Sequence, residues 1–495
     1  MFFVMKLIRA LMRKPITGSC CQKLGGQSCL TVWIVSGILL VSFGSGVTPS
    51  QAADSKYMLR PKTESRQPTD VQIRLNVTGE LMAANSGEKP VKLPITANAQ
   101  LAYSEISRVF GVDHQDPVQA VRWYDRATVE MRVDGITHRV QLSNQRRMLV
   151  YHSDNAHTEL FAVSGPLSHD ELDLIDVPLS SAVVDRLLPN EEIKVGEIWS
   201  HEAMAMADLL RLDVVHKTDA KSKLVRVEDD QAKIELNGRI DGSIDGVSTE
   251  MKLSAKYTFD LQSRRIVWLV MDIGEQRAIG HASPGMQVTA RIQLKITPFD
   301  PSEFRHTQLT DLTGIELNPQ EKNLLLRYRS LHGGFQIYHD RSWQVMLDRD
   351  DVTVMRMVQN GDLIAQCNVS KLSDSPSGKR RQLNEFQENV RSGLGNSFEQ
   401  FVEVDQYESE LGLRILRVVA TGKVENLPIQ WIYCHVSNDL GKQASYVFTI
   451  ESKLIAKFGA ADRAFSRSFD FVGKPPKITG KTRSTVISKP PVPDA

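Results

Sequence analysis

The sequence predicts an α+β fold class, in which a large curved antiparallel β domain is followed by a smaller antiparallel sheet with packed helices. Three observations predict it. Asp-Gly and Asn-Gly dipeptides separate segments that alternate apolar and polar residues, as in two-residue hairpins. Apolar residues at every second position recur through residues 53–300. From residue 334 to 472 the order becomes strands, helix, strands, helix, which predicts helices packed on a sheet.

Composition bounds the class of protein. A chain of 495 residues is too long for one ordinary core, and its apolar (41%) and charged (24%) contents are those of globular proteins. Residues 1–53 carry five basic residues and no acid, so the remainder holds 55 basic and 59 acidic residues, a net charge of −4. A mildly acidic chain has no electrostatic reason to bind nucleic acid.

The N-terminus has the three parts of a secretory signal. A basic start precedes the apolar run 30–43, and small residues follow it. We expect residues 1–52 to be a signal peptide that is cleaved before Ala53; an uncleaved membrane anchor is the alternative. The mature chain has no other stretch that could span a membrane. The sequence therefore predicts an exported protein, periplasmic or extracellular.

The clearest hairpin lies around Asp245-Gly246. If a type I′ turn forms there, residues whose numbers sum to 491 face each other. The apolar pairs on one face are then Ile244–Val247, Ile240–Met251, Leu236–Ala255 and Ile234–Tyr257. Asp134-Gly135 predicts a second hairpin that pairs Val129 with Val140 and Glu130 with Arg139. A sheet with one dry face and one wet face fits this pattern.

A curved sheet with one apolar face can form a groove for a lipid. The residues that would line such an apolar ligand face are Ile240, Ile244, Met251, Leu253 and Tyr257. Packing of the same residues against helices, without a cavity, is the alternative. Short helices are expected at 180–188 and 203–211.

The second domain is expected at residues 334–472, after a connector at 301–333 with a short helical run near 323–329. Asn360-Gly361 predicts a hairpin that sets Cys367 opposite Val354. An apolar stripe from Leu383 to Phe401 has helical spacing, although Gly393 and Gly395 could break the helix. Strands near 412–421, 428–437 and 443–451 precede a final helix at 458–468.

This order of elements, with the opening FQIYHDRSW and the close FSRSFDFV, resembles the Mog1/PsbP-like α/β sandwich over residues 334–472. The resemblance implies a binding or assembly module, and it transfers no partner because members of one fold differ in function. The first domain, with LLPNEEIKVGEIWS at 187–200, resembles segments of exported bacterial proteins of unknown function.

Two further features concern covalent state and order. Of the five cysteines, Cys367 and Cys434 remain after the signal, and export permits them to pair as a disulfide; two buried free thiols are the alternative. The tail 473–495 has five prolines and five basic residues and is expected to be disordered.

No known catalytic or cofactor motif emerges. His201 and Glu202 begin the zinc-protease pattern, but Ala205 stands where the second histidine would be. We interpret His201 as a surface or turn residue between a strand and a short helix. No cofactor or metal ligand set is evident.

The leading hypothesis is therefore an exported, non-enzymatic binding or assembly module of the bacterial cell envelope, whose partner is a protein or an envelope component. A carrier of an apolar, lipid-like ligand in the β domain is the second hypothesis. A hydrolase with an unrecognised site is the third, because ordinary Asp, Glu and His residues can converge without a motif.

Overall fold

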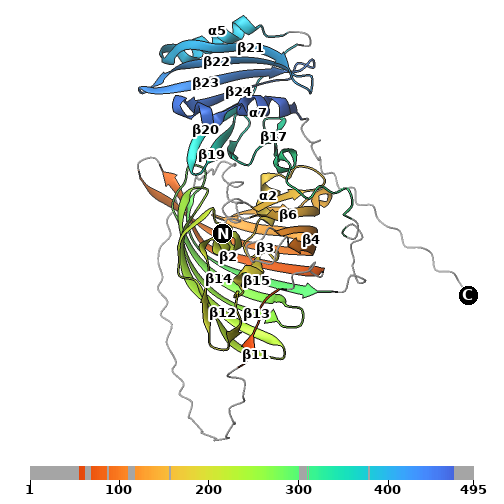
Figure 1. Cartoon of the computed structure of the whole chain (residues 1–495). Coiled ribbons are helices and arrows are strands. Elements are labelled where there is room, and N and C mark those ends of the chain that lie inside the picture. Colours follow the sequence, from red (N-terminus) through yellow and green to blue (C-terminus); the bar gives the residue numbers. More distant parts are fainter. Residues whose placement is uncertain are drawn as a thin grey trace, which may run out of the picture.

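The computed structural model describes residues 55–61, 68–85, 88–109, 118–154, 158–299, 309, 312–376 and 380–472. The predicted signal peptide and tail lie outside the described residues. Of the described residues, 58% are in strands and 15% in helices. A large curved sheet and a smaller sheet above it make up the molecule in Figure 1.

The large sheet contains thirteen described strands in the order β7-β6-β4-β3-β2-β15-β14-β13-β12-β11-β9, with β5 beside β4 and β10 beside β12. Every pairing between them is antiparallel. The strands are β2 (Thr69–Asn85), β3 (Glu88–Val109), β4 (Val118–Val133), β5 (Ile136–Gln141), β6 (Met148–Ser153), β7 (Thr158–Ala162), β9 (Ile198–Ser200), β10 (Val214–Thr218), β11 (Lys221–Glu228), β12 (Gln231–Ile244), β13 (Val247–Asp260), β14 (Arg265–Arg277) and β15 (Gly285–Pro298).

Both Asp-Gly hairpins of this sheet are confirmed. Ile244 faces Val247 and Ile240 faces Met251 across β12 and β13. Val129 faces Val140 across β4 and β5. Asp134 and Asp245 have positive φ angles of 47° and 50°, as a type I′ turn requires at its first central residue. Turn chemistry and apolar alternation therefore set the register together.

The apolar face of the large sheet packs on residues 163–213, which we call the core segment. It contains α2 (His169–Ile175), the 3₁₀ turn η3 (Val184–Leu187) and α3 (Ala203–Leu210). Six of the seven residues of α2 are buried, and its N-terminus has a capping box between Ser168 and Glu171. Within the core segment, β8 (Ile193–Lys194) pairs with β1 (Lys56–Tyr57). The segment and the sheet share one hydrophobic core.

Buried polar contacts also tie the core segment to the sheet. The Arg122 guanidinium on β4 donates to Glu105 on β3 at 2.7 Å and to the Ser180 hydroxyl at 2.7 Å. It lies over the rings of Tyr103 and Tyr151, 4.8 and 4.6 Å from their centroids. Because a buried charge is costly unless it is paired, these contacts hold the segment in one position.

The smaller unit follows residue 312. Its seven-stranded sheet has the order β18-β19-β20-β24-β23-β22-β21, and a three-stranded sheet has the order β16-β17-β25. The elements are α4 (Glu321–Leu324), β16 (Leu326–Ser330), β17 (Phe335–His339), β18 (Trp343–Asp348), β19 (Thr353–Gln359), β20 (Asp362–Lys371), α5 (Leu383–Leu394), the 3₁₀ turn η6 (Gly395–Ser397), β21 (Phe398–Glu408), β22 (Arg414–Val424), β23 (Leu427–Ser437), β24 (Gln443–Glu451), the 3₁₀ turn η7 (Ser452–Leu454), α6 (Ile455–Phe458), α7 (Ala461–Ser468) and β25 (Asp470–Phe471).

The predicted α+β fold class is wrong, because strands dominate both units and the described helices are short. The predicted helix at 383–401 accounts for part of the error. The α5 helix ends at Leu394, and Gly395 follows with a φ of 52°. Phe398 and Phe401 instead belong to β21, where a β-bulge between Phe398 and Gln400 places both rings on the same side, with centroids 4.7 Å apart. The bulge thus gives a strand the three-residue spacing of a helix.

Smaller errors have similar local causes. The predicted helical run near 323–329 becomes α4 followed by the strand β16, and the helix predicted at 180–188 is the short turn η3. The Asn360-Gly361 hairpin forms and pairs Val358 with Leu363, but a β-bulge after Met357 shifts the register, so Met355 faces Cys367 in place of Val354.

Several contacts between the two units are hydrogen bonds to main-chain groups. Arg341 donates to the carbonyl oxygen of Leu160 on the edge strand β7 at 2.6 Å. The His169 ring nitrogen Nε2 lies 2.7 Å from the carbonyl oxygen of Trp343. In Figure 1 the units meet near α2, β6 and β17. The hairpin turns at Gly246 and Gly361 also touch, since a Cβ on Gly246 would lie 2.3 Å from the Gly361 nitrogen.

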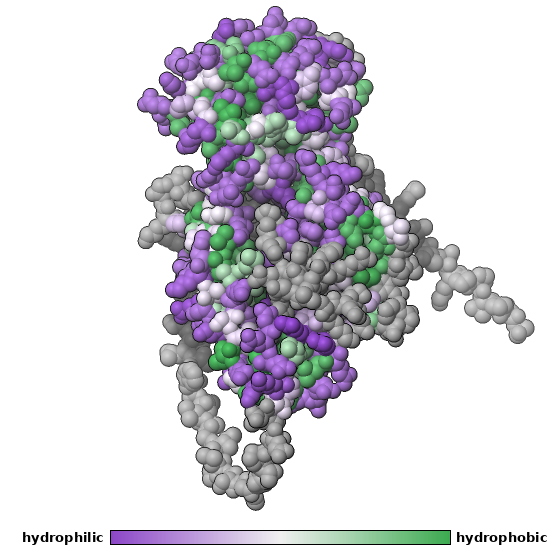
Figure 2. Space-filling model, in the orientation of Figure 1, coloured by the Kyte–Doolittle hydropathy of each residue, from purple (hydrophilic) through white to green (hydrophobic). Residues whose placement is uncertain are grey.

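The surface seen in Figure 2 is mainly hydrophilic, with hydrophobic residues in small groups. Among the described residues, no helix has the length and apolar character needed to cross a membrane.

The contact between the two turns predicts that Gly246→Ala destabilises the protein more than Gly135→Ala. Both glycines follow an aspartate in a hairpin turn at positive φ, so each alanine costs about 1 kcal/mol of backbone strain. Nothing lies within 4 Å of a Cβ on Gly135, whereas a Cβ on Gly246 meets the other unit, which adds about 1–3 kcal/mol. Calorimetric unfolding of both variants measures the difference. Equal losses would contradict the contact.

Candidate functional site

The predicted apolar ligand face is part of the protein core. Ile240, Ile244, Met251, Leu253 and Tyr257 are only 1–3% exposed. They share one hydrophobic cluster with Met206, Leu209 and Leu210 of α3. The Tyr257 hydroxyl lies 3.1 Å from the carbonyl oxygen of Leu187 in the core segment. At these five positions the chain's own side chains therefore occupy the space that a lipid would need.

Cys367 and Cys434 are free thiols and do not form a disulfide. They lie on β20 and β23, which flank β24 on opposite sides. Because neighbouring strands are about 4.8 Å apart, their Cα atoms are separated by roughly two strand spacings, beyond the reach of a disulfide. Burial raises the pKa of the Cys434 thiol to about 12, so the reactive thiolate is suppressed.

We expect the thiols of Cys367 and Cys434 to react with a thiol reagent only after unfolding. Both cysteines are buried and have raised pKa values. Titration of the full chain with and without denaturant, compared with a Cys367→Ala, Cys434→Ala variant, counts them. A pair that stays unreactive in denaturant until a reductant is added would contradict the free-thiol state.

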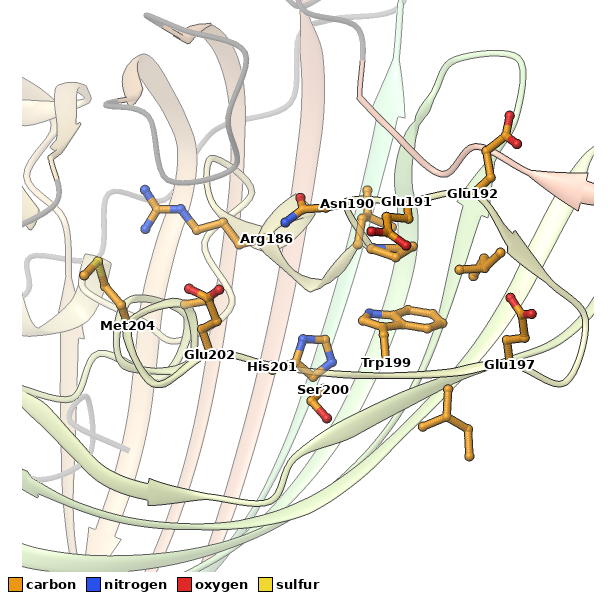
Figure 3. Close-up of a pocket in the computed structure, with 15 residues that line it drawn as sticks. Arg186, Asn190, Glu191, Glu192, Glu197, Trp199, Ser200, His201, Glu202 and Met204 are labelled. Atoms are coloured by element: carbon orange, nitrogen blue, oxygen red, sulfur yellow. The ribbon is translucent and has the colours of Figure 1, made fainter.

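A pocket of about 580 Å³ opens at the edge strand β9, within the core segment (Figure 3). Its walls are formed by Arg186 of η3, the loop after η3, the strand β9 and the start of α3. The lining residues are Arg186, Leu188, Pro189, Asn190, Glu191, Glu192, Ile193, Glu197, Ile198, Trp199, Ser200, His201, Glu202, Met204 and Ala205. The pocket thus includes His201 and Glu202, the two residues of the incomplete zinc-protease pattern.

A hydrogen-bonded chain holds the inner wall of the pocket. The His201 ring nitrogen Nε2 lies 2.7 Å from the Ser222 hydroxyl, which lies 2.9 Å from the Tyr257 hydroxyl. The carbonyl oxygen of Leu187 accepts from the indole nitrogen of Trp199 at 3.0 Å and also lies within reach of Tyr257. Strand register sets this arrangement, since Trp199 pairs with Ser222 between β9 and β11. The rings of Trp199 and His201 are therefore held in fixed orientations.

His201 is a neutral residue at pH 7. Burial lowers the pKa of its imidazole to about 4, because the charged form loses hydration and gains no acidic partner. Its side chain is directed between Glu202 and Trp199 in Figure 3. The sequence-based interpretation placed His201 correctly between a strand and a short helix, but wrongly on the surface: it is only 7% exposed.

Acidic groups dominate the charge of the lining. It has four glutamates, Glu191, Glu192, Glu197 and Glu202, and one arginine. That arginine, Arg186, forms an ion pair with Asp208. Glu191 and Glu192 are exposed at the rim, and Glu191 lies on the same side of the pocket as the Trp199 ring in Figure 3. The pocket therefore offers hydrogen-bond acceptors and negative charge.

Apolar groups complete the mouth of the pocket. Ile198 is 61% exposed and Met204 is 46% exposed, beside the half-buried Trp199. Large apolar side chains on a mostly hydrophilic surface are typical of contact sites. The sequence has no motif that marks this site, although all of its lining residues lie between Arg186 and Ala205. The fold of that stretch decides which of its side chains face the pocket.

The contact between His201 and Ser222 has the geometry of a base and a hydroxyl nucleophile, but it cannot serve acyl transfer in this conformation. Ser222 is fully buried, so its oxygen cannot reach a substrate carbonyl. Within the described part of the chain, no group of three or more His, Cys, Asp or Glu side chains is placed to hold a metal ion.

The lowered pKa of His201 predicts an acid-sensitive stability. The unfolded histidine binds a proton near pH 6.5 and the folded one only near pH 4, so the unfolded state holds more protons between these values. Stability therefore falls as the pH drops from 6.5 to 4, by about 3 kcal/mol. Urea unfolding at pH 7 and pH 4.5 measures this loss. It should shrink in His201→Gln and persist in His216→Gln, which alters an exposed histidine. An unchanged loss in His201→Gln would contradict the assignment.

Comparisons with known proteins leave the family open. No protein-family model matches the chain. No curated protein matches it. Among solved structures, the solution structure of cyanobacterial PsbP (CyanoP) from Synechocystis sp. is 14% identical, covers 30% of this chain and 92% of its own, and has a TM-score of 0.24. DynF from the dynemicin biosynthesis pathway of Micromonospora chersina is 7% identical, covers 53% and 96%, and has a TM-score of 0.12.

The crystal structure of OccAB4 from Acinetobacter baumannii is 8% identical, covers 79% of this chain and 98% of its own, and has a TM-score of 0.11. TM-scores this low carry no argument about fold or function. The resemblance of residues 334–472 to the Mog1/PsbP-like family stays a prediction.

Proposed function

We propose that this protein is an exported binding module of the cell envelope, and that the pocket at β9 holds a cationic, partly apolar group of its partner. One observation carries the proposal. The lining has four carboxylates, and its single arginine is already paired with Asp208. A cation entering the pocket meets acceptors and negative charge, whereas an anion would meet repulsion.

The apolar groups of the pocket support the same partner chemistry. A cation over an indole ring is attracted by the negative face of the ring. Ile198 and Met204 can contact the alkyl part of a lysine or arginine side chain, or of a free alkylamine. Neutral His201 adds a polar ring without a competing positive charge. The shared chemistry is therefore an alkylammonium or guanidinium group.

Two features favour binding over catalysis. The one hydroxyl that contacts a histidine at this site, that of Ser222, is inaccessible. The glutamates at the rim are exposed, where they can recognise charge but lack a dry environment for proton transfer. The basic and apolar N-terminal segment of the sequence supports export.

Calorimetric titration with a lysine-rich peptide, spermidine and hexanoate tests the proposal. We expect the two cations to bind and hexanoate not to bind. Glu191→Gln, Glu192→Gln together remove two exposed charges and should weaken cation binding about 5- to 30-fold, since each exposed pair contributes roughly 0.5–1 kcal/mol. The matched control is Glu410→Gln, which changes an exposed glutamate in the other unit.

The two cationic probes distinguish the source of the group. Tighter binding of the peptide indicates a protein partner, and tighter binding of spermidine indicates a free amine. The proposal would be contradicted if hexanoate bound as strongly as the cations. It would also be contradicted if the double variant and the control bound the cations equally.

A further inference from the structure

A second groove, of about 690 Å³, crosses the outer face of the large sheet. It spans β11 to β15 near the turn between β13 and β14. Its surface includes Val225, Trp268 and four basic residues, namely Arg226, Lys233, Lys256 and Lys295. This face is opposite to the one that packs on the core segment.

Alternation along the strands explains why apolar groups are exposed here. Leu269 and Met271 of β14 are buried in the core, so Trp268 points to the other face, where it is 43% exposed. Trp268 pairs with Lys295 on β15 and with Thr258 on β13. A β-bulge in β11 between Leu224 and Arg226 leaves Val225 38% exposed at the same groove.

The charge of the groove is positive. Its lining has four basic residues and one acid, Glu235. Glu235 pairs with Lys256 at 3.1 Å, and Arg226 pairs with Glu228 at 3.2 Å. Lys233 donates only to neutral groups, the Gln231 amide oxygen at 2.6 Å and the Thr258 hydroxyl at 3.3 Å. The charges of Lys233 and Lys295 are therefore left uncompensated within the groove.

We infer that this groove docks the headgroup of an anionic phospholipid at a membrane surface. The uncompensated lysines attract the phosphate, and Trp268 and Val225 contact the boundary between headgroup and acyl chain, where tryptophan is favoured. A fully polar anion would gain nothing from the two apolar residues. The net charge of −4 outside the N-terminal segment rules out a general attraction to anions, so the recognition is local to the groove.

The groove and the pocket at β9 have no lining residue in common. The pocket is acidic and lies at the sheet edge, and the groove is basic and lies on the outer face. A protein could therefore lie against a membrane through the groove and still present the pocket to a partner.

Vesicle flotation with the full chain tests the inference. We compare vesicles of phosphatidylcholine with vesicles of phosphatidylcholine and phosphatidylglycerol. Anionic vesicles should bind more tightly, and added salt should weaken the binding. Lys295→Gln should lower the affinity for anionic vesicles about 5-fold, because each lysine near an anionic surface contributes about that factor. Trp268→Thr should also lower it, by a comparable factor.

The control is Lys423→Glu, which alters an exposed lysine on β22 of the other unit and should leave binding unchanged. Melting temperatures of all variants verify folding. The N-terminal segment is the same in every variant, so it cannot cause a difference between them. Equal binding to the two kinds of vesicle, or no loss in Lys295→Gln and Trp268→Thr, would overturn the inference. Complete competition by inorganic phosphate would also overturn the inference, because a free anion alone would then account for binding in the groove.

Discussion

Covering one apolar sheet face is the constraint on which the rest of this structure depends. Apolar residues at every second position of long antiparallel strands give the large sheet one apolar face. Exposure of this face to water would be unfavourable. The chain covers it with residues 163–213, which contribute α2, η3 and α3 to the same core. A sheet of this size without such a cover would expose an aggregation-prone surface. The core segment is therefore a structural necessity, and its side chains pack against Ile240, Ile244, Met251, Leu253 and Tyr257.

The polar contacts under the core segment add specificity to this packing. Apolar contacts alone would let the segment slide, because the hydrophobic effect has no direction. Arg122 removes that freedom by bonding Glu105 and Ser180 at once while its guanidinium lies between two tyrosine rings. The Asp176–Arg211 ion pair, at 2.6 Å, joins two parts of the segment itself. With the segment fixed, Leu187 reaches Trp199 and Tyr257, and the wall of the pocket is fixed too.

The two surface sites arise from different properties of the same sheet. The pocket forms where the sheet ends at β9 and the core segment turns back toward α3, so its lining mixes strand, loop and helix residues. The groove forms within the outer face, where alternation places lysines and Trp268 side by side. The pocket at the sheet edge is thus acidic and the groove on the outer face is basic, which is compatible with two partners of different chemistry.

Local strand pairings could be predicted from the amino-acid sequence. Asp-Gly turns and two-residue alternation specified the registers of two hairpins, because turn geometry and burial of one face act within a few residues. The same reasoning placed α3 at 203–211 and located strands at 428–437 and 443–451. It failed where a bulge changed the period, as at Phe398, Phe401 and Cys367, since a bulge depends on the neighbouring strand.

Packing between distant segments determines what covers the dry face and how the two surface sites are shaped. The apolar and polar alternation around Ile240 and Tyr257 would be the same whether a lipid or a chain segment covered them. The segment that covers them is distant in the sequence. The capping box at Ser168 and Glu171 was a local signal for α2, but no local signal links Leu187 to Trp199. The fold class and the state of the two cysteines depend on contacts between residues far apart in the sequence. The pocket around His201 is lined by one stretch, 186–205, but its inner wall also needs Ser222 and Tyr257.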